Sequence, residues 1–162
     1  AEEAFRAIYN KYSPRIYAYC LRVLGNKSLA EDVFQETFVR FYEKAKSSYN
    51  KGTVNGFLIT IARNLCLNHK RDKKSNIPFE EYHQILHTDS ENREEVYKLI
   101  TASLDLLEFE FREPLVLRMY DGPSYKEISE VCEISVENAR KRVFRAKQKI
   151  REILEPYYNE IY

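Results

Sequence analysis

Apolar residues recur along most of this chain at alternating spacings of three and four, which is the pattern of helices with one buried stripe. Glycine is scarce, with 4 in 162 residues, and stretches that alternate apolar and polar residues are few. The pattern predicts an all-α fold, with helices over residues 2–24, 29–46, 54–74, 94–104, 108–120, 124–132 and 135–155.

Short polar motifs mark where several of these helices should begin. A Ser followed three residues later by Glu can satisfy two free backbone N–H groups of a first turn. This capping box occurs at Ser28 and Glu31, and again at Ser124 and Glu127. Ser135 is a further N-cap candidate.

The first predicted helix contains Pro14, and the last predicted helix is followed by Pro156. Because proline lacks an N–H and clashes with the preceding turn, we expect Pro14 to kink the first helix or restart it near Ser13. For the same reason we expect Pro156 to end the last helix.

The segment from Gly122 to Arg151 contains a short helix, a tight turn and a longer basic helix. This is the pattern of a helix-turn-helix, whose second helix enters the DNA major groove by its N-terminal residues. Residues 135–151 hold seven Lys or Arg against Glu137 alone. A solvated charged face is the alternative, but one-signed charge directly after the turn favours DNA as the partner.

A second basic cluster, residues 63–74, carries a net charge of +4. Side chains that stack on bases or bond to them accompany it at Tyr49, Asn55, Phe57 and Asn64. Because unpaired bases are held by stacking above a cationic groove, this stretch is a candidate site for single-stranded DNA. For Phe57 a role in the core stays equally open.

The formal net charge of the whole chain is +1, so the remaining surface is acidic and suits a basic protein partner. Part of that surface is a polar face on the predicted helix 29–46, made by Glu31, Asp32, Gln35 and Glu36. The helix dipole accounts for Glu31 and Asp32. It does not account for Gln35 and Glu36, which lie further along the helix.

Residues 75–93 lose the helical periodicity and are rich in polar and acidic side chains, as linkers are. We therefore expect two small helical domains, residues 1–74 and 94–162, joined by a flexible linker. His83 and His87 lie four residues apart in the linker, but without a third strong ligand they do not indicate a metal site. No metal and no other cofactor is expected.

The cysteine spacing, the hydropathy and the surroundings of the tyrosines argue against a secreted protein, a membrane protein and a recombinase. Cys20, Cys66 and Cys132 are odd in number and far apart, which is typical of reduced thiols in a cytoplasmic protein. No apolar run approaches 18 residues and no signal peptide opens the chain, so neither membrane insertion nor export is indicated. A recombinase would need a nucleophilic Ser or Tyr among arginines, and none of the 13 Tyr has such neighbours in sequence, so no catalytic residue is predicted.

Several motifs follow one another in a fixed order. They are LAEDVFQETFVRFY at 29–42, FLITIARNL at 57–65, Arg112-Glu113, SYKEIS at 124–129, and ISV at 134–136 with the basic run 142–147. Together they resemble the extracytoplasmic-function (ECF) group of the sigma-70 family of bacterial RNA polymerase sigma factors. The resemblance runs from about Phe5 to Leu154, and it implies sigma region 2 in residues 1–74 and region 4 in residues 94–162.

For region 2, the resemblance implies docking on core RNA polymerase through Asp32, Gln35, Glu36 and Phe38, which would explain a polar face in mid-helix. It also implies that region 2 recognises and holds the separated strand of the downstream promoter element. The residues at the matching positions are Tyr49, Asn55, Arg63, Asn64, Lys70 and Arg71.

For region 4, the resemblance implies readout of the upstream promoter element in the major groove. Bases would be contacted by Glu137, Asn138, Arg140 and Lys141, and mainly phosphates by Arg142, Arg145 and Lys147. Ser135, at the start of the same helix, is counted with these residues.

The resemblance thus implies a cytoplasmic sigma factor that binds core RNA polymerase, directs promoter-specific transcription initiation and is restrained by an anti-sigma partner. Such a protein is not itself an enzyme. The rival interpretation is a helix-turn-helix regulator that binds duplex operator DNA without polymerase. It leaves the motif from Asp32 to Phe38 unexplained.

Some residues depart from the family's pattern. Phe57 stands where Trp is common, and Glu108 replaces the usual Pro. Glu133 occupies the position of the turn Gly, so it must either adopt a left-handed backbone conformation or alter the turn. Phe109 and Phe111 would form a protein-binding surface if exposed and part of the core if buried, and we favour the core.

Overall fold

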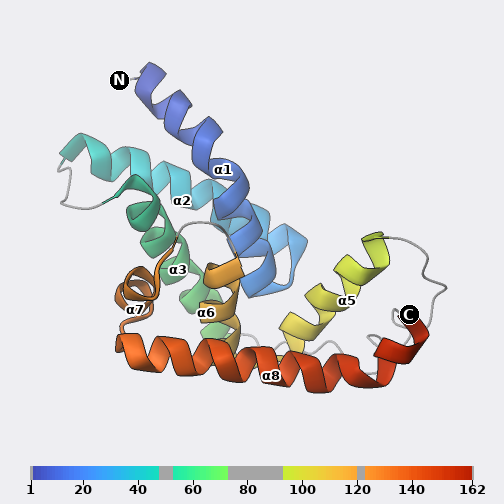
Figure 1. Ribbon diagram of the computed structural model, residues 1–162. Helices are drawn as coiled ribbons and strands as arrows, with labels where there is room; N and C mark the ends of the chain where they lie inside the picture. The colour runs from blue at the N-terminus through green and yellow to red at the C-terminus, as the bar shows by residue number, and fades with distance from the viewer. Residues whose placement is uncertain (1, 48–52, 73–92, 120–122, 162) are drawn as a thin grey trace. The chain divides into compact units, whose positions relative to one another are not determined.

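The computed structural model describes residues 2–47, 53–72, 93–119 and 123–161, and these contain seven α-helices and no strand. The helices are α1 (Glu2–Leu24), α2 (Lys27–Ser47), α3 (Val54–Asp72), α5 (Arg93–Leu106), α6 (Phe109–Met119), α7 (Tyr125–Cys132) and α8 (Val136–Ile161) (Figure 1). They belong to two compact units, Ala1–Lys74 and Ser75–Tyr162. The predicted all-α fold with two helical domains is confirmed, while most of the predicted linker lies outside the described residues.

The start of α2 differs from the predicted capping box. The N–H of Leu29 donates to Asn26 Oδ1 at 2.9 Å, and the N–H of Ala30 donates to the Asn26 carbonyl at 2.9 Å. Asn26 is therefore the N-cap, and Ser28 is already inside the helix. The preceding Gly25 closes α1 with φ 68°, a left-handed conformation that glycine adopts without strain.

Both prolines lie inside helices. The expected interruption near Ser13 does not divide α1, which continues through Pro14 to Leu24. The expectation that Pro156 ends the last helix is wrong, because α8 continues to Ile161. A proline removes only one backbone hydrogen bond, and in α1 the buried Ile16 and Tyr19 directly after it hold the helix by packing.

In the first unit, α1, α2 and α3 each pack against the other two. Aromatic rings fill the space between α1 and α2, and Phe38 lies at their centre. Its ring is 4.8 Å from that of Tyr9 and 5.3 Å from that of Phe34, both in edge-to-face arrangements, and Phe38 is only 3% exposed. Phe57 of α3 is half-buried and packs its ring 5.6 Å from that of Phe41, which places it with the core side of the unit.

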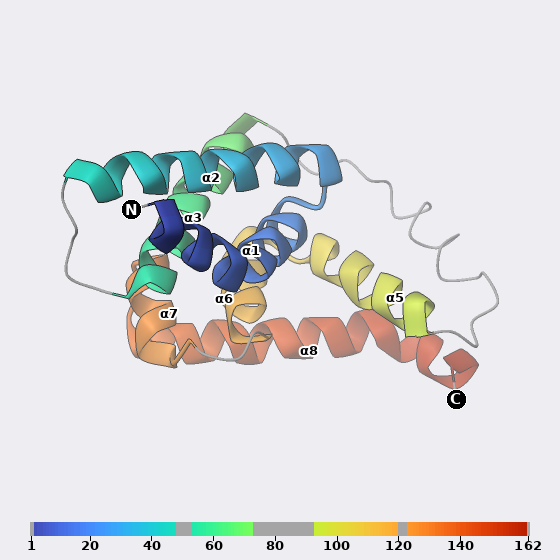
Figure 2. The same ribbon diagram turned by 90° about the horizontal axis from the view of Figure 1, so that it is seen from above.

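In the second unit, α5, α6 and α7 all pack on the long helix α8 (Figure 2). The predicted apolar stripe of α8 is the contact surface, with Ala139, Val143 and Ala146 at most 1% exposed. Phe111 is buried, as favoured from the sequence, and Lys149 Nζ lies 4.1 Å from the centre of its ring. Phe109 is half-buried.

Arg112 closes the turn between α5 and α6. Its Nη2 donates to the carbonyl of Leu107 at 2.7 Å, and Arg112 itself is only 8% exposed. Because the last carbonyls of a helix lack partners in the helix, a buried guanidinium at this point stabilises the end of α5.

The turn between α7 and α8 keeps its geometry despite the absence of glycine. Ser124 caps α7 by accepting the N–H of Glu127 at 3.1 Å, as predicted. Glu133 adopts φ 56° and ψ 45°, the left-handed conformation, so the backbone accepts the strain and the turn is not altered. The N–H of Ile134 then donates to the carbonyl of Ser129 at 3.0 Å and satisfies the end of α7.

Replacing Phe38 with Ala should lower the free energy of unfolding by about 3–5 kcal/mol, because it leaves a cavity among the rings. The matched control is Val39→Ala, since Val39 is the next residue of α2 but is 56% exposed, and its loss should cost less than about 0.5 kcal/mol. Urea unfolding of the full chain, followed by circular dichroism, measures both. Equal stabilities of the two variants would show that the ring cluster does not hold the unit.

Replacing Glu133 with Gly should raise the stability of the second unit by about 1 kcal/mol, because glycine adopts the left-handed conformation without the clash of a Cβ. Glu133→Ala removes the carboxylate but keeps the strain, and it serves as the control for charge. Thermal unfolding distinguishes them: a gain with Ala as large as with Gly would assign the effect to charge and contradict the backbone argument.

Candidate nucleic-acid and protein interfaces

One face of α8 carries the residues predicted to bind the upstream element. Because Ala139, Val143 and Ala146 occupy the buried stripe, the residues between them point outward. The exposed members of the predicted set are Ser135, Glu137, Asn138, Arg140, Lys141, Arg145 and Lys147, and Arg142 is half-buried. The structure therefore brings seven of the eight predicted residues onto α8, with Ser135 as its N-cap, and leaves seven of the eight exposed.

The N-terminus of α8 is fixed by its cap. Ser135 Oγ accepts the N–H of Asn138 at 3.1 Å, as predicted. Lys141 Nζ lies 3.2 Å from Glu137 Oε1, but the two side chains are 60% and 77% exposed, so this ion pair contributes little and leaves both charges available. The helix start is rigid while its polar side chains remain free to meet a ligand.

Some surface residues were missed by the sequence analysis. Phe144 is 62% exposed on the cationic face of α8. The exposure of Phe144 could have been predicted from the sequence, because Phe144 follows Val143 and so lies about 100° around the helix from the buried stripe. Tyr125 lies close to both Arg118 and Arg140, which no local pattern indicates because the three residues come from three different helices.

On α2, the predicted polar face is exposed. Asp32, Gln35 and Glu36 all point to solvent, and the exposed Val39 continues the same side of the helix. Glu36 is paired with Arg40 at 2.8 Å, with both side chains nearly half exposed. We name Asp32, Gln35, Glu36 and Val39 the α2 stripe. Phe38, predicted with it, is buried and supports the stripe from beneath.

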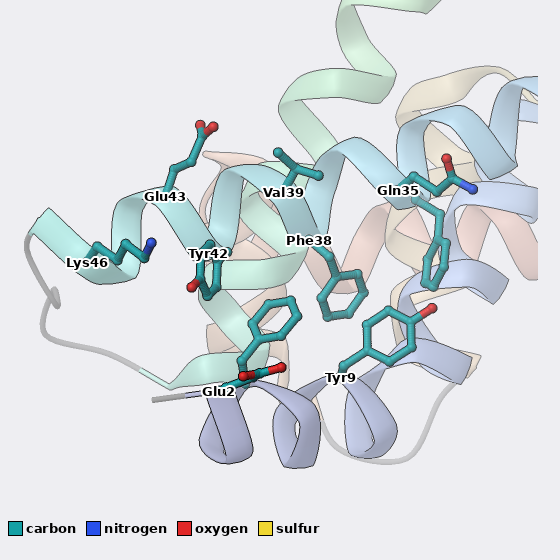
Figure 3. Close-up of a pocket in the computed structure, with 10 residues that line it drawn as sticks. Glu2, Tyr9, Gln35, Phe38, Val39, Tyr42, Glu43 and Lys46 are labelled. Carbon is teal, nitrogen blue, oxygen red and sulfur yellow. The ribbon is translucent and has the colours of Figure 1, made fainter.

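Beside the stripe, α1 and α2 enclose a groove of about 730 Å³ with an aromatic floor (Figure 3). Figure 3 shows the rings of Tyr9 and Phe38 facing each other between the two helices. Charged side chains lie at the rim, where Glu2, Glu43 and Lys46 line the groove. Lys46 Nζ is 4.3 Å from the centre of the Tyr42 ring, so that aromatic wall is partly covered by a cation.

The residues predicted to hold the separated DNA strand lie mainly on α3. Asn64 is exposed and Arg63 is half-buried. Asn55 Oδ1 is buried without a hydrogen-bond partner among the described residues. Lys70 and Arg71 belong to the last turns of α3, but their side chains, like the whole of Tyr49, lie outside the described residues.

The described ranges contain no group of three or more His, Cys, Asp or Glu that could hold a metal ion. The pair His83 and His87 lies outside them. Cys20, Cys66 and Cys132 are free thiols and are buried, as small core residues are. Of the helices that the structure describes, none combines the length and apolar character needed to span a bilayer.

Comparison with known proteins gives the same division of the chain. The family model for sigma-70 region 2 matches residues 8–76, and that for sigma-70 region 4 matches residues 97–150. Among solved structures, the sigma factor RpoE of Bartonella quintana in complex with the anti-sigma factor NepR has a TM-score of 0.74 and 19% identity, covering 94% of this chain and 98% of that one. CnrH, in complex with the cytosolic domain of CnrY, has a TM-score of 0.72 and 21% identity, covering 96% and 90%. At these identities the likeness shows the fold alone.

Relatives in sequence decide the family. The ECF RNA polymerase sigma factor SigE of Mycolicibacterium smegmatis is 32% identical over 94% of this chain, which spans 62% of that protein. SigW of Bacillus subtilis is 30% identical, covering 94% of this chain and 90% of SigW. SigM of Bacillus subtilis is also 30% identical, covering 89% of this chain and 91% of SigM. With the exposed cationic helix, the α2 stripe and both family models in order, this likeness shows that the chain belongs to the ECF group of sigma-70 family RNA polymerase sigma factors.

Proposed function

We propose that the second unit reads the upstream promoter element by placing α8 in the major groove. The observation that carries this proposal is the exposure of seven predicted DNA-binding residues on one capped helix whose opposite stripe is buried. Glu137, Asn138, Arg140 and Lys141 lie near the N-terminus, which is the part of a recognition helix that meets base edges. Arg142, Arg145 and Lys147 follow on the next turns and are suited to phosphates.

For the first unit we propose capture of the separated strand of the downstream element along α3. Asn64 is exposed for bonds to unpaired bases, and the half-buried Arg63 lies beside it. Asn55, which is half-buried near the start of α3, belongs to the same proposed set. Tyr49, Lys70 and Arg71 complete the proposed strand-binding set.

Core RNA polymerase would dock on the α2 stripe. The stripe offers two carboxylates, an amide and the exposed apolar side chain of Val39. This composition suits a protein interface in which charged groups determine which partner binds and the buried area is small. This assignment explains Gln35 and Glu36, which the helix dipole does not. Phe38 contributes by holding α2 in place rather than by contact.

We further propose that an anti-sigma factor restrains this chain, as the solved relatives RpoE and CnrH were captured with NepR and CnrY. The chain would act in the cytoplasm, where polymerase and promoters are, and would not be an enzyme. The rival interpretation, a helix-turn-helix regulator acting without polymerase, is not supported, because the relatives that show the family are RNA polymerase sigma factors. Co-purification with core polymerase tests the docking proposal.

Replacing Arg140 with Ala should weaken binding of the polymerase holoenzyme to the upstream element by about 1–3 kcal/mol and relax the base preference at one position. Lys147→Ala is the matched comparison, because loss of a phosphate contact should weaken all sequences alike and lower the salt slope by about one. Fluorescence anisotropy with duplex variants at two salt concentrations measures both effects. Loss of polymerase affinity with unchanged promoter preference in Arg140→Ala would contradict the assignment.

Replacing Asp32 and Glu36 together with Ala should reduce affinity for core polymerase about tenfold, or about 1.4 kcal/mol, because both charges lie in the proposed interface. Glu3→Ala removes a carboxylate that is also exposed, but on α1, and should leave the affinity unchanged. Titration of labelled chain with core polymerase gives the two constants. Identical affinities in the double variant and in Glu3→Ala would place the docking site elsewhere.

A further inference from the structure

The ring of Tyr125 lies close to two guanidinium groups that come from different helices. The guanidinium carbon of Arg118, near the end of α6, is 4.4 Å from the centre of the ring. That of Arg140, in the second turn of α8, is 5.5 Å from it. Tyr125 itself is the first residue of α7. One half-buried ring thus joins three helices of the second unit at the N-terminal end of α8.

The position of this ring is set by the backbone around it. Ser124, directly before Tyr125, is the N-cap of α7 and accepts the N–H of Glu127 at 3.1 Å. Arg118 Nη1 donates to the carbonyl of Pro123 at 3.2 Å, so Arg118 is anchored to the same turn. The ring therefore presents a fixed surface toward Arg140, while Arg140 itself is exposed.

A fixed aromatic surface matters for an arginine that reads bases. A free arginine side chain populates many rotamers, and ordering it on binding opposes affinity. A guanidinium held against a ring within about 6 Å of its centre is restrained before the ligand arrives, and its N–H fork stays available at the edge. An arginine ordered in this way loses less entropy when it forms a bidentate contact with a base.

We propose that Tyr125 is a positioning residue for upstream-element recognition. Its ring, held by the contact with Arg118, restrains the guanidinium of Arg140 in an orientation that faces the major groove. The proposal rests on the proposed function of α8. It assigns the π-face of Tyr125 as the active feature and gives the phenolic hydroxyl no part in DNA binding. Arg118 acts through the ring.

The test is a double-mutant cycle on the holoenzyme, made from the full chain and core polymerase and bound at fixed salt to a promoter fragment mapped by in vitro transcription. Tyr125→Leu should lower affinity about three- to tenfold, whereas Tyr125→Phe, which keeps the ring, should stay within about twofold of the wild type. In an Arg140→Ala background, Tyr125→Leu should change affinity less than about twofold, because the residue that it positions is gone.

Three outcomes overturn the proposal, and they are distinguishable. An equal loss from Tyr125→Leu with and without Arg140 shows that the ring does not act through Arg140. A loss in Tyr125→Phe as large as in Tyr125→Leu assigns the role to the hydroxyl. If Arg140→Ala alone leaves affinity unchanged, the proposed reading of the upstream element by Arg140 fails as well.

A measurement on the unmutated chain keeps the proposal testable if Tyr125→Leu does not fold. The ¹⁵N order parameter of the Arg140 Nε–H should exceed that of Arg145, an exposed arginine two turns or less away on the same helix, and Tyr125→Phe should preserve the difference. Equal order parameters for the two arginines would show that the ring does not restrain Arg140 and would overturn the proposal.

Discussion

Each helix of this chain can bury only one stripe of its surface, and that constraint determines which residues are left to meet partners. In α8, Ala139, Val143 and Ala146 face inward at positions separated by four and three residues, so the cations between them must face outward. The same rule governs α2, where buried Val33 and Phe41 leave the α2 stripe exposed. The apolar pattern that builds each unit is thus also the pattern that exposes its proposed binding residues.

Two of the inward-facing residues of α8 are small, which affects how neighbouring helices can pack on it. Ala139 and Ala146 are fully buried, and alanine allows neighbouring helices to approach closely. The surrounding helices α5, α6 and α7 all pack against α8. Since the same helix carries the proposed DNA-binding face, its orientation depends on this packing and on the caps at Ser135 and Ser124.

In the first unit, stability and contact are divided between two sides of α2. The rings of Phe34, Phe38 and Phe41 hold it against α1, while the α2 stripe faces solvent. Phe38 matches the family's docking motif but is buried, so a residue that matches the motif need not contact the partner. A residue can belong to an interface motif because it keeps the helix in place and not because it touches the partner.

The sequence by itself determined the helical class, the division into two domains, the positions of most helix starts and the residues that α8 exposes. These are local properties, since periodicity and N-caps depend on residues within a turn or two of one another. It misjudged the cap of α2, where Asn26 precedes Ser28, and the effect of Pro156, where the helix continues. In both cases the local sequence was compatible with more than one helix boundary, and the sequence pattern alone did not show which boundary would form.

Tertiary structure alone decided the features that join distant parts of a unit. Burial of Phe38 depends on Phe5 and Tyr9 of another helix, and the left-handed conformation of Glu133 depends on how α7 and α8 pack. Likewise, Arg118, Tyr125 and Arg140 meet only because α6, α7 and α8 converge. Periodicity tells which side of a helix is buried, but not which side chains of other helices lie against it, because that is set by the packing of the whole unit.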